Sequence, residues 1–221
     1  MKCQVTYLHH CGYQVETDHS FLVFDWIEGK IKTSNKTKIC FITHSHQDHY
    51  RPDVFEKDFD AFIVSNDVKT QSHDKIIWVK EGDQLSPLSL TIEVLGSTDL
   101  GVSYYVEVDG VHLFFAGDLN NWHWSKESTQ EEIDEMNEQF LKKIKPLQGK
   151  NVDVLFIDID PRLQVNYDLG AKQLLEIIQP KAIFPMHFTS DIHKIREYYA
   201  TTQIKNLIPV FEDNSEFELD W

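Results

Sequence analysis

The sequence predicts an α/β protein in which two β-sheets pack together and helices cover their outer sides. Between residues 4 and 116, short apolar runs rich in β-forming residues alternate with polar turns. After residue 128, apolar runs alternate with segments whose apolar residues recur at helical spacing. Strands followed by alternating strands and helices are typical of two sheets with helices outside. The 221 residues suit one larger α/β domain, and no linker divides them, so we expect a single domain over 1–221.

The N-terminal part is expected to consist of strands and turns. The predicted strands are 4–8, 20–24, 39–43, 61–65, 75–79, 90–95, 103–108 and 112–116. Asp109-Gly110 separates the last two strands and is a strong hairpin signal. The run 39–43 is continuously apolar and ends at a histidine cluster, which predicts a buried strand leading into a loop.

The C-terminal part is expected to alternate between helices and buried strands. The predicted elements are a helix over 128–144, a strand over 152–159, a helix over 168–178, a strand over 182–185 and a helix over 191–199. Ser128 and Glu131 have the spacing of a capping box for the first helix. The second helix is expected to begin at an Asp168 cap and to end before Pro180.

Charge and cysteine usage limit the class of partner and the compartment. The formal net charge of -15 argues against a nucleic-acid backbone or an anionic membrane as the main partner. No signal peptide or membrane span is recognisable, and the three cysteines form no disulfide framework or CxxC motif. Cys40 lies in an apolar run and is expected to be a buried thiol. We therefore expect a cytoplasmic protein acting on a small molecule; no pattern specifies its oligomeric state.

One short cluster carries the strongest chemical signal. His44, His46, Asp48 and His49 follow the predicted strand 39–43. Residues two apart in an extended chain point the same way, so His44 and His46 can face one point while Asp48 and His49 follow in the turn. Imidazoles and a carboxylate are the ligands that zinc prefers, with manganese or iron as alternatives. A polar loop with solvated histidines is the competing interpretation.

Two further strand ends offer ligands. Asp118 follows an apolar run and Gly117, and His187 follows the apolar residues 183–186. Alone, Asp118 would be read as a turn or helix-capping residue, and His187 as a core histidine. Together with the cluster they extend the predicted ligand set for one or two divalent metal ions.

The order HxHxDH, then Gly-Asp, then a late histidine after a strand resembles the metallo-β-lactamase superfamily over most of the chain. The segment 7–26 is similar to that family's opening hairpin and Asp-containing strand. The tetrapeptide 185–188, PMHF, is similar to the branch that includes ascorbate-phosphate lactonase and phospholipase D relatives. The resemblance implies a four-layer αββα sandwich of two mixed β-sheets with helices on the outside.

The same resemblance implies a role for each matching residue. It assigns His44 and His46 to a first metal position, Asp48, His49 and His187 to a second, Asp118 to a bridge between them, and Asp25 to a place behind the ligands. It implies a metal-dependent hydrolase that makes hydroxide available at ordinary pH and attacks a small ester, lactone or phosphoester. Asp48 or Asp118 would orient the water and handle its proton.

The chain departs from the family at one ligand. The stretch 95–104, where the family usually has another histidine, contains none. His73 precedes this stretch, and His112 is expected at the wrong end of a strand. Asp99 is a candidate replacement, whose oxygen would favour a harder metal such as manganese or iron; its alternative is an ordinary turn residue. Otherwise the first position is weak or empty, or the chain binds no metal tightly.

Several residues are expected at the mouth of the site. Trp122 and Trp124 flank His123 directly after Asp118, and His123 is a candidate acid, base or ligand. The alternative is that both tryptophans pack the next helix and His123 faces solvent. Asp158, Asp160 and Arg162 lie at or after the end of the strand expected over 152–159 and could line the same rim. Arg162 can bind an anionic group there, and the alternative is a structural ion pair of Asp160 or Arg162.

Three other functions stay open at this point. They are a metal-binding or sensor protein with reduced or no catalysis, a ribonuclease-like phosphodiesterase, and a two-iron oxidoreductase. The acidic charge counts against the second, and the absence of room for a flavin domain counts against the third. His9, His10 and Cys11 are interpreted as part of a hairpin because they adjoin Gly12.

Overall fold

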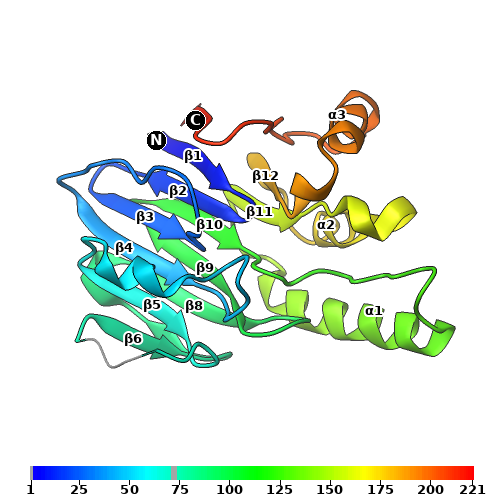
Figure 1. Cartoon of the computed structure of the whole chain (residues 1–221), viewed down its shortest axis with the longest axis horizontal. Coiled ribbons are helices and arrows are strands. Elements are labelled where there is room, and N and C mark those ends of the chain that lie inside the picture. The colour runs from blue at the N-terminus through cyan, green and yellow to red at the C-terminus, as the bar shows by residue number, and fades with distance from the viewer. Residues whose placement is uncertain (1, 71–73) are drawn as a thin grey trace.

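Two mixed β-sheets form the centre of the protein, whose computed structural model describes residues 2–70 and 74–221 (Figure 1). The first sheet has the order β13-β1-β2-β3-β4-β5-β6 and contains β13 (Glu216–Asp220), β1 (Lys2–His9), β2 (Gly12–Glu16), β3 (Ser20–Phe24), β4 (Thr37–Ile42), β5 (Ala61–Ser65) and β6 (Ile76–Val79). The second has the order β12-β11-β10-β9-β8-β7 and contains β12 (Ala182–Met186), β11 (Val154–Asp158), β10 (Val111–Phe115), β9 (Val102–Val108), β8 (Thr91–Gly96) and β7 (Gln84–Leu85). The predicted α/β class with two mixed sheets is confirmed.

The helices lie mainly beside the second sheet. They are α1 (Gln130–Ile144), α2 (Leu169–Leu174) and α3 (Ile192–Thr201), and Figure 1 shows them grouped on one side of the molecule. The outer face of β3, β4 and β5 is instead covered by a segment that includes the 3₁₀ helix Pro52–Glu56, through the buried Val54 and Phe59. A short apolar turn is therefore enough to bury that face.

Helix starts and ends differ in detail from the sequence prediction. The capping box of α1 is formed by Thr129 and Glu132, one residue later than the predicted Ser128 and Glu131, because both pairs have the required spacing. α2 is shorter than predicted, and no side-chain capping bond forms at Asp168. The Asp168 carboxylate instead accepts a hydrogen bond from the Tyr198 hydroxyl.

Three strands, β2, β7 and β13, were not predicted from the sequence. β2 follows the turn after β1, and β13 pairs antiparallel with β1 at the edge of the first sheet. β13 alternates charged and apolar residues with the burial pattern of an edge strand, so its hydrophobic signal is weak. The predicted Asp109-Gly110 hairpin is present, with positive φ at both residues.

The core between the sheets is rich in aromatic side chains. Phe24 of β3 stacks on Phe41 of β4 at 4.6 Å and on Phe115 of β10 at 4.7 Å between ring centroids. Two buried tyrosines also join the sheets: the Tyr104 hydroxyl donates to the carbonyl oxygen of Ile42, 2.8 Å away, and Tyr13 does the same to Pro185. The strands that end at the site are therefore fixed across the sandwich.

Parallel pairing aligns strand ends within each sheet, and the packing of the two sheets brings both sets of ends to one side of the sandwich. β3 and β4 are parallel in the first sheet, and β10, β11 and β12 are parallel in the second. The carboxyl ends of parallel strands meet at the same edge of a sheet. The segments that carry the predicted ligands follow these strands, so they converge there. Within the described part of the chain, no helix is long and apolar enough to cross a membrane.

Candidate metal centre

Asp25 holds the loop after β4 in place. This buried carboxylate directly follows β3, and its Oδ1 accepts a hydrogen bond from the Thr43 backbone amide at 2.8 Å. Its Oδ2 accepts from the Thr43 hydroxyl at 2.6 Å and lies 2.8 Å from His49 Nδ1. When Nδ1 of an imidazole donates to a carboxylate, its Nε2 keeps a free lone pair that can bind a metal. This is the usual arrangement of a metal-binding histidine.

His187, after β12, is oriented in the same way. Its Nδ1 lies 3.3 Å from Oδ2 of the buried Asp160. Arg162 forms an ion pair with Asp160, and a guanidinium nitrogen lies 2.9 Å from the same His187 Nδ1. A guanidinium can only donate, so His187 Nδ1 must be unprotonated to bond with Arg162. The same Nδ1 must carry a proton to bond with Asp160, which is the opposite tautomer. A metal on Nε2 would select the tautomer whose Nδ1 donates to Asp160.

The free nitrogens of both histidines meet at Asp118. Nε2 of His49 lies 2.9 Å, and Nε2 of His187 3.1 Å, from Asp118 Oδ1. The two nitrogens are 3.3 Å apart. Ligands at these separations can share one ion at the usual distances of about 2.0–2.2 Å. The three side chains therefore fit a divalent metal, and all are buried.

A second group surrounds the other oxygen of Asp118. Ligand atoms of His44, His46 and Asp118 lie within 4.8 Å of one another, with His44 Nε2 3.5 Å from Asp118 Oδ2. Asp99 Oδ2 lies 3.7 Å from His46 Nδ1. Both His46 and Asp99 are partly exposed, so this position is more open to solvent than the His49–His187 position.

Charge within the cluster shifts the protonation of its members. Burial by itself would raise the pKa of Asp118, but His49, His187 and His44 hold it well below its usual range. Burial by itself would lower the pKa of His49 and His187, but nearby anionic groups, including Cys11 and Asp118, raise it well above 6.5. Protons and a metal therefore compete for the same nitrogen atoms.

Two buried residues outside the predicted ligand set also reach this cluster. Cys11 lies in the turn between β1 and β2, and Asp158 is the last residue of β11. Ligand atoms of Cys11, Asp118, Asp158 and His187 lie within 4.8 Å of one another. The position of Asp158 at a strand end was a usable signal, whereas Cys11 carried none because it belongs to a hairpin.

Asp48 occupies a different place from the buried ligands. It lines the pocket outside them, and its Oδ2 lies 3.5 Å from His10 Nε2. This contact holds the pKa of Asp48 well below its usual range. Burial lowers the pKa of His10, but Cys11 and Asp48 raise it to about 9.

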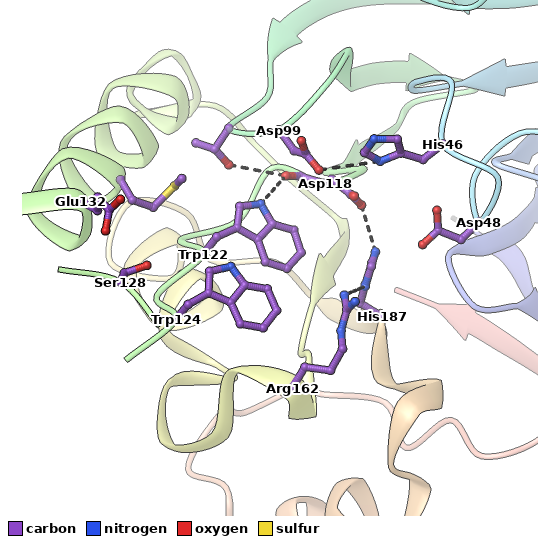
Figure 2. Close-up of a pocket in the computed structure, with 12 residues that line it drawn as sticks. His46, Asp48, Asp99, Asp118, Trp122, Trp124, Ser128, Glu132, Arg162 and His187 are labelled. Atoms are coloured by element: carbon purple, nitrogen blue, oxygen red, sulfur yellow. Dashed lines mark hydrogen bonds and ion pairs between the residues drawn. The ribbon is translucent and has the colours of Figure 1, made fainter. Parts of the chain in front are cut away.

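An open pocket of about 480 Å³ gives access to the centre (Figure 2). The predicted residues that line it are His46, Asp48, Asp99, Asp118, Trp122, Trp124, Arg162 and His187. Figure 2 shows the two indoles side by side; their planes differ by 7°, and Trp122 Nε1 donates to the Asp118 carbonyl oxygen at 3.1 Å. Arg162 lies over Trp124 at 5.8 Å. Glu132 and Met136 of α1 also line the pocket.

Other predicted candidates lie elsewhere. His44 and His49 are buried beneath the pocket, and Asp160 is buried under Arg162. His123 is partly buried and does not line the pocket. His112 bonds to Asp153 at 3.0 Å near the amino ends of β10 and β11, as expected for the far edge, and His73 lies outside the described residues.

Three residues at this edge have left-handed backbone. His10, Asp25 and His187 are non-glycine residues with φ of 52°, 43° and 61°. Left-handed backbone costs roughly 1–2 kcal/mol per ordinary residue. Such residues cluster where a site requires a particular side-chain direction, and here each directs an imidazole or carboxylate toward the cluster.

Comparison with solved structures identifies the fold. No family model matches the chain, and a search among curated proteins finds no relative. The chain is similar over its full length to Igni18, a metallo hydrolase from Ignicoccus hospitalis that is covered completely, with a TM-score of 0.67 and 19% identity. It is also similar to the metallo-β-lactamase fold protein YhfI from Bacillus subtilis, with a TM-score of 0.65, 13% identity and coverage of 97% of this chain and 99% of YhfI.

A third similarity involves a different chemistry. CmlA, a diiron β-hydroxylase from Streptomyces venezuelae, aligns with a TM-score of 0.51 and 14% identity over 84% of this chain and 44% of CmlA. At these identities the comparisons concern the fold, and the predicted likeness to the lactonase branch stays a prediction. The order of the strands, the position of the histidine cluster and these alignments agree that the chain has the metallo-β-lactamase fold.

Proposed function

We propose that the protein is a metal-dependent hydrolase that acts on a small ester, lactone or phosphoester. One observation carries the proposal: the Nε2 atoms of His49 and His187 converge on Asp118, while their Nδ1 atoms face the buried carboxylates Asp25 and Asp160. Carboxylates behind two convergent imidazoles are typical of metal sites and are not needed to bury ordinary histidines.

The ligands divide into two positions that share Asp118. His49 and His187 would hold the inner ion, and His44 and His46 would hold an outer one with Asp99 beside it. Zinc suits the imidazole-rich inner position, and the carboxylate beside the outer position admits manganese or iron. When bound, such an ion lowers the pKa of its water toward neutrality and polarises the oxygen that gains charge.

Residues around the pocket would position the substrate and the water. Asp48 stays ionised at neutral pH and faces the pocket, so it can accept a hydrogen bond from an attacking water. Trp122 and Trp124 offer a flat apolar wall, and Arg162 at its edge can contact an anionic oxygen of the substrate. The pocket volume is in the range used for small molecules.

The acidic lining favours small substrates over a nucleic acid. Asp48, Asp99, Asp118 and Glu132 face the pocket, against the single guanidinium of Arg162. This field opposes the approach of a polyanion, so ribonuclease-like cleavage is the weaker proposal.

A specific observation supports a second candidate, a metal-binding or sensor protein with little catalysis. The outer position has two imidazoles, and the only carboxylate within reach besides Asp118 among the described residues is Asp99, 3.7 Å from His46. A weakly held outer ion would leave the inner ion tightly bound and poorly placed to activate water near the pocket.

The test combines elemental analysis with an activity screen. Protein purified without added metal is analysed for bound ions and assayed on chromogenic esters, lactones and phosphoesters, beside His49→Ala and the control His112→Ala. We expect bound metal and hydrolysis in the wild type and the control, and loss of both in His49→Ala. No metal in the wild type, even after reconstitution, would refute the metal-dependent proposal. Metal without hydrolysis of any class would favour the sensor.

A further inference from the structure

Cys11 is placed as a metal ligand would be, although it lies in a hairpin turn. Its side chain is fully buried, and its sulfur belongs to two groups of ligand atoms that lie within 4.8 Å of one another. One group joins Cys11 to His10, His49 and His187, and the other to Asp118, Asp158 and His187. His187 is common to both groups, so the Cys11 sulfur lies near a ring nitrogen of His187 in either.

Asp158 supplies an independent observation. It is fully buried, and neither of its carboxylate oxygens has a hydrogen-bond partner among the described residues. Burying a carboxylate without a partner is strongly unfavourable, so such a group is normally protonated, paired or bound to a metal. One of its oxygens lies in the second group, with Cys11, Asp118 and His187.

Asp48 does not lie among the buried ligand atoms as Cys11 and Asp158 do. It belongs to none of the groups of ligand atoms found in the described part of the chain, and its side chain is 47% exposed. Its Oδ2 lies 3.5 Å from His10 Nε2. The side chains that the fold buries around His187 are Cys11 and Asp158 instead.

We propose that Cys11 and Asp158 are further ligands of the inner metal ion, beside His49, His187 and Asp118. This inference rests on the proposed metal-dependent function and deepens it, because it names the ligands and therefore the ion. The ion would bind the thiolate form of Cys11, and the protons that the imidazoles hold would be released to solvent. Cys11 comes from the β1–β2 turn, and Asp158 from the end of β11.

The ligand set determines the preferred ion. A thiolate favours zinc over manganese or magnesium, whereas a site of carboxylates and imidazoles alone discriminates less. Thiolate sulfur, imidazole nitrogen and carboxylate oxygen are all donors that zinc accepts. The inner position should therefore be selective for zinc.

Cobalt substitution tests the sulfur bond without relying on activity. The full-length protein is stripped of metal and titrated with Co²⁺, and its near-ultraviolet and visible absorption is recorded. We expect a thiolate-to-cobalt charge-transfer band in the wild type, its loss in Cys11→Ser, and its retention in the control Cys40→Ala, which removes another buried thiol. A band that persists in a folded Cys11→Ser protein would overturn the proposal.

The wild-type spectrum alone keeps the proposal falsifiable if Cys11→Ser does not fold. Bound cobalt with visible bands but no charge-transfer band would overturn the thiolate ligand and leave the metal-dependent function standing. Failure of the wild type to bind either cobalt or zinc would instead refute the proposed function on which the inference rests.

Asp158→Asn tests the second ligand in the same experiment. We expect its zinc affinity, measured by chelator competition, to fall by more than the roughly 10–100-fold typical of lost outer contacts. The charge-transfer band should persist in this variant at saturating cobalt, because Cys11 is intact. Unchanged zinc affinity in a folded Asp158→Asn protein would overturn the assignment of Asp158.

Discussion

His49 Nε2 lies 3.3 Å from His187 Nε2, although 138 positions separate the two residues in the sequence. Two imidazole nitrogens at this distance would repel if both carried a proton and would have no hydrogen to share if both were bare. Asp118 Oδ1 lies 2.9 and 3.1 Å from the two nitrogens, and its negative charge partly offsets the repulsion between them. A divalent ion at the same point would satisfy all three atoms at once.

Replacement of the carboxylate behind His49 should weaken metal binding without removing a ligand. Asp25 Oδ2 faces both the Thr43 hydroxyl and His49 Nδ1. The amide of Asp25→Asn is neutral and has a single acceptor oxygen, so His49 loses its preferred orientation. We expect zinc affinity to fall about 10–100-fold in a chelator competition assay. Asp153→Asn is the matched control, because Asp153 faces His112 Nδ1 at the opposite edge. Equal losses in both variants would indicate a general effect on folding.

Asp99 should determine the outer position. Its carboxylate is 3.7 Å from His46 and occupies the stretch where the family usually has a histidine. In Asp99→Ala we expect loss of the weaker of two metal equivalents by elemental analysis, with the inner ion retained. Asp99→His should tighten that equivalent and shift its preference from manganese toward zinc. Identical metal content in all three proteins would show that Asp99 is only a turn residue.

Gly101 should be intolerant of a side chain. Its φ is 72°, and an added Cβ would lie 2.0 Å from the Thr43 carbonyl oxygen and 2.6 Å from His44 Cβ. Gly82→Ala is the control, because Gly82 has φ of 91° and nothing within 4 Å of an added Cβ. Both variants bear the cost of left-handed backbone, roughly 1–2 kcal/mol.

Only Gly101→Ala should add an overpacking cost of about 1–3 kcal/mol to this backbone cost. Urea denaturation measures the difference in the free energy of unfolding, and we also expect weaker metal binding at His44. Equal destabilisation of Gly101→Ala and Gly82→Ala would contradict the predicted clash.

Metal affinity should fall as the pH is lowered. The pKa values of His49 and His187 lie well above 6.5, because Cys11 and Asp118 outweigh the effect of burial. Below those raised values each imidazole holds a proton that a metal must displace, and raising the pH removes this competition. Isothermal titration in buffers of different ionisation enthalpy should show proton release on zinc binding. Affinity that is constant between about pH 5 and 8 would contradict these assignments.

Much of the fold followed from patterns local in the sequence. The runs now seen as β3, β4, β5, β8, β9, β10, β11 and β12 were predicted because buried strands are continuously apolar and end at polar residues. β13 was missed because its alternation of charged and apolar residues suits a half-exposed edge strand that pairs only with β1. The start of α1 was one residue off because two overlapping capping boxes fit the sequence equally well.

The sequence by itself determined the compact ligand cluster and the strand ends that could join it. His44, His46 and His49 are within six residues of one another, so their proximity needs only a strand and a turn. Asp118 and His187 could be added because each follows an apolar run that predicts a strand, and because their order along the chain resembles that of the metallo-β-lactamase superfamily. Only the tertiary structure brought Cys11 and Asp158 to the same point. The hairpin comes from one sheet and β11 from the other, and the closeness of two such side chains depends on how the sheets pack, which no local pattern encodes.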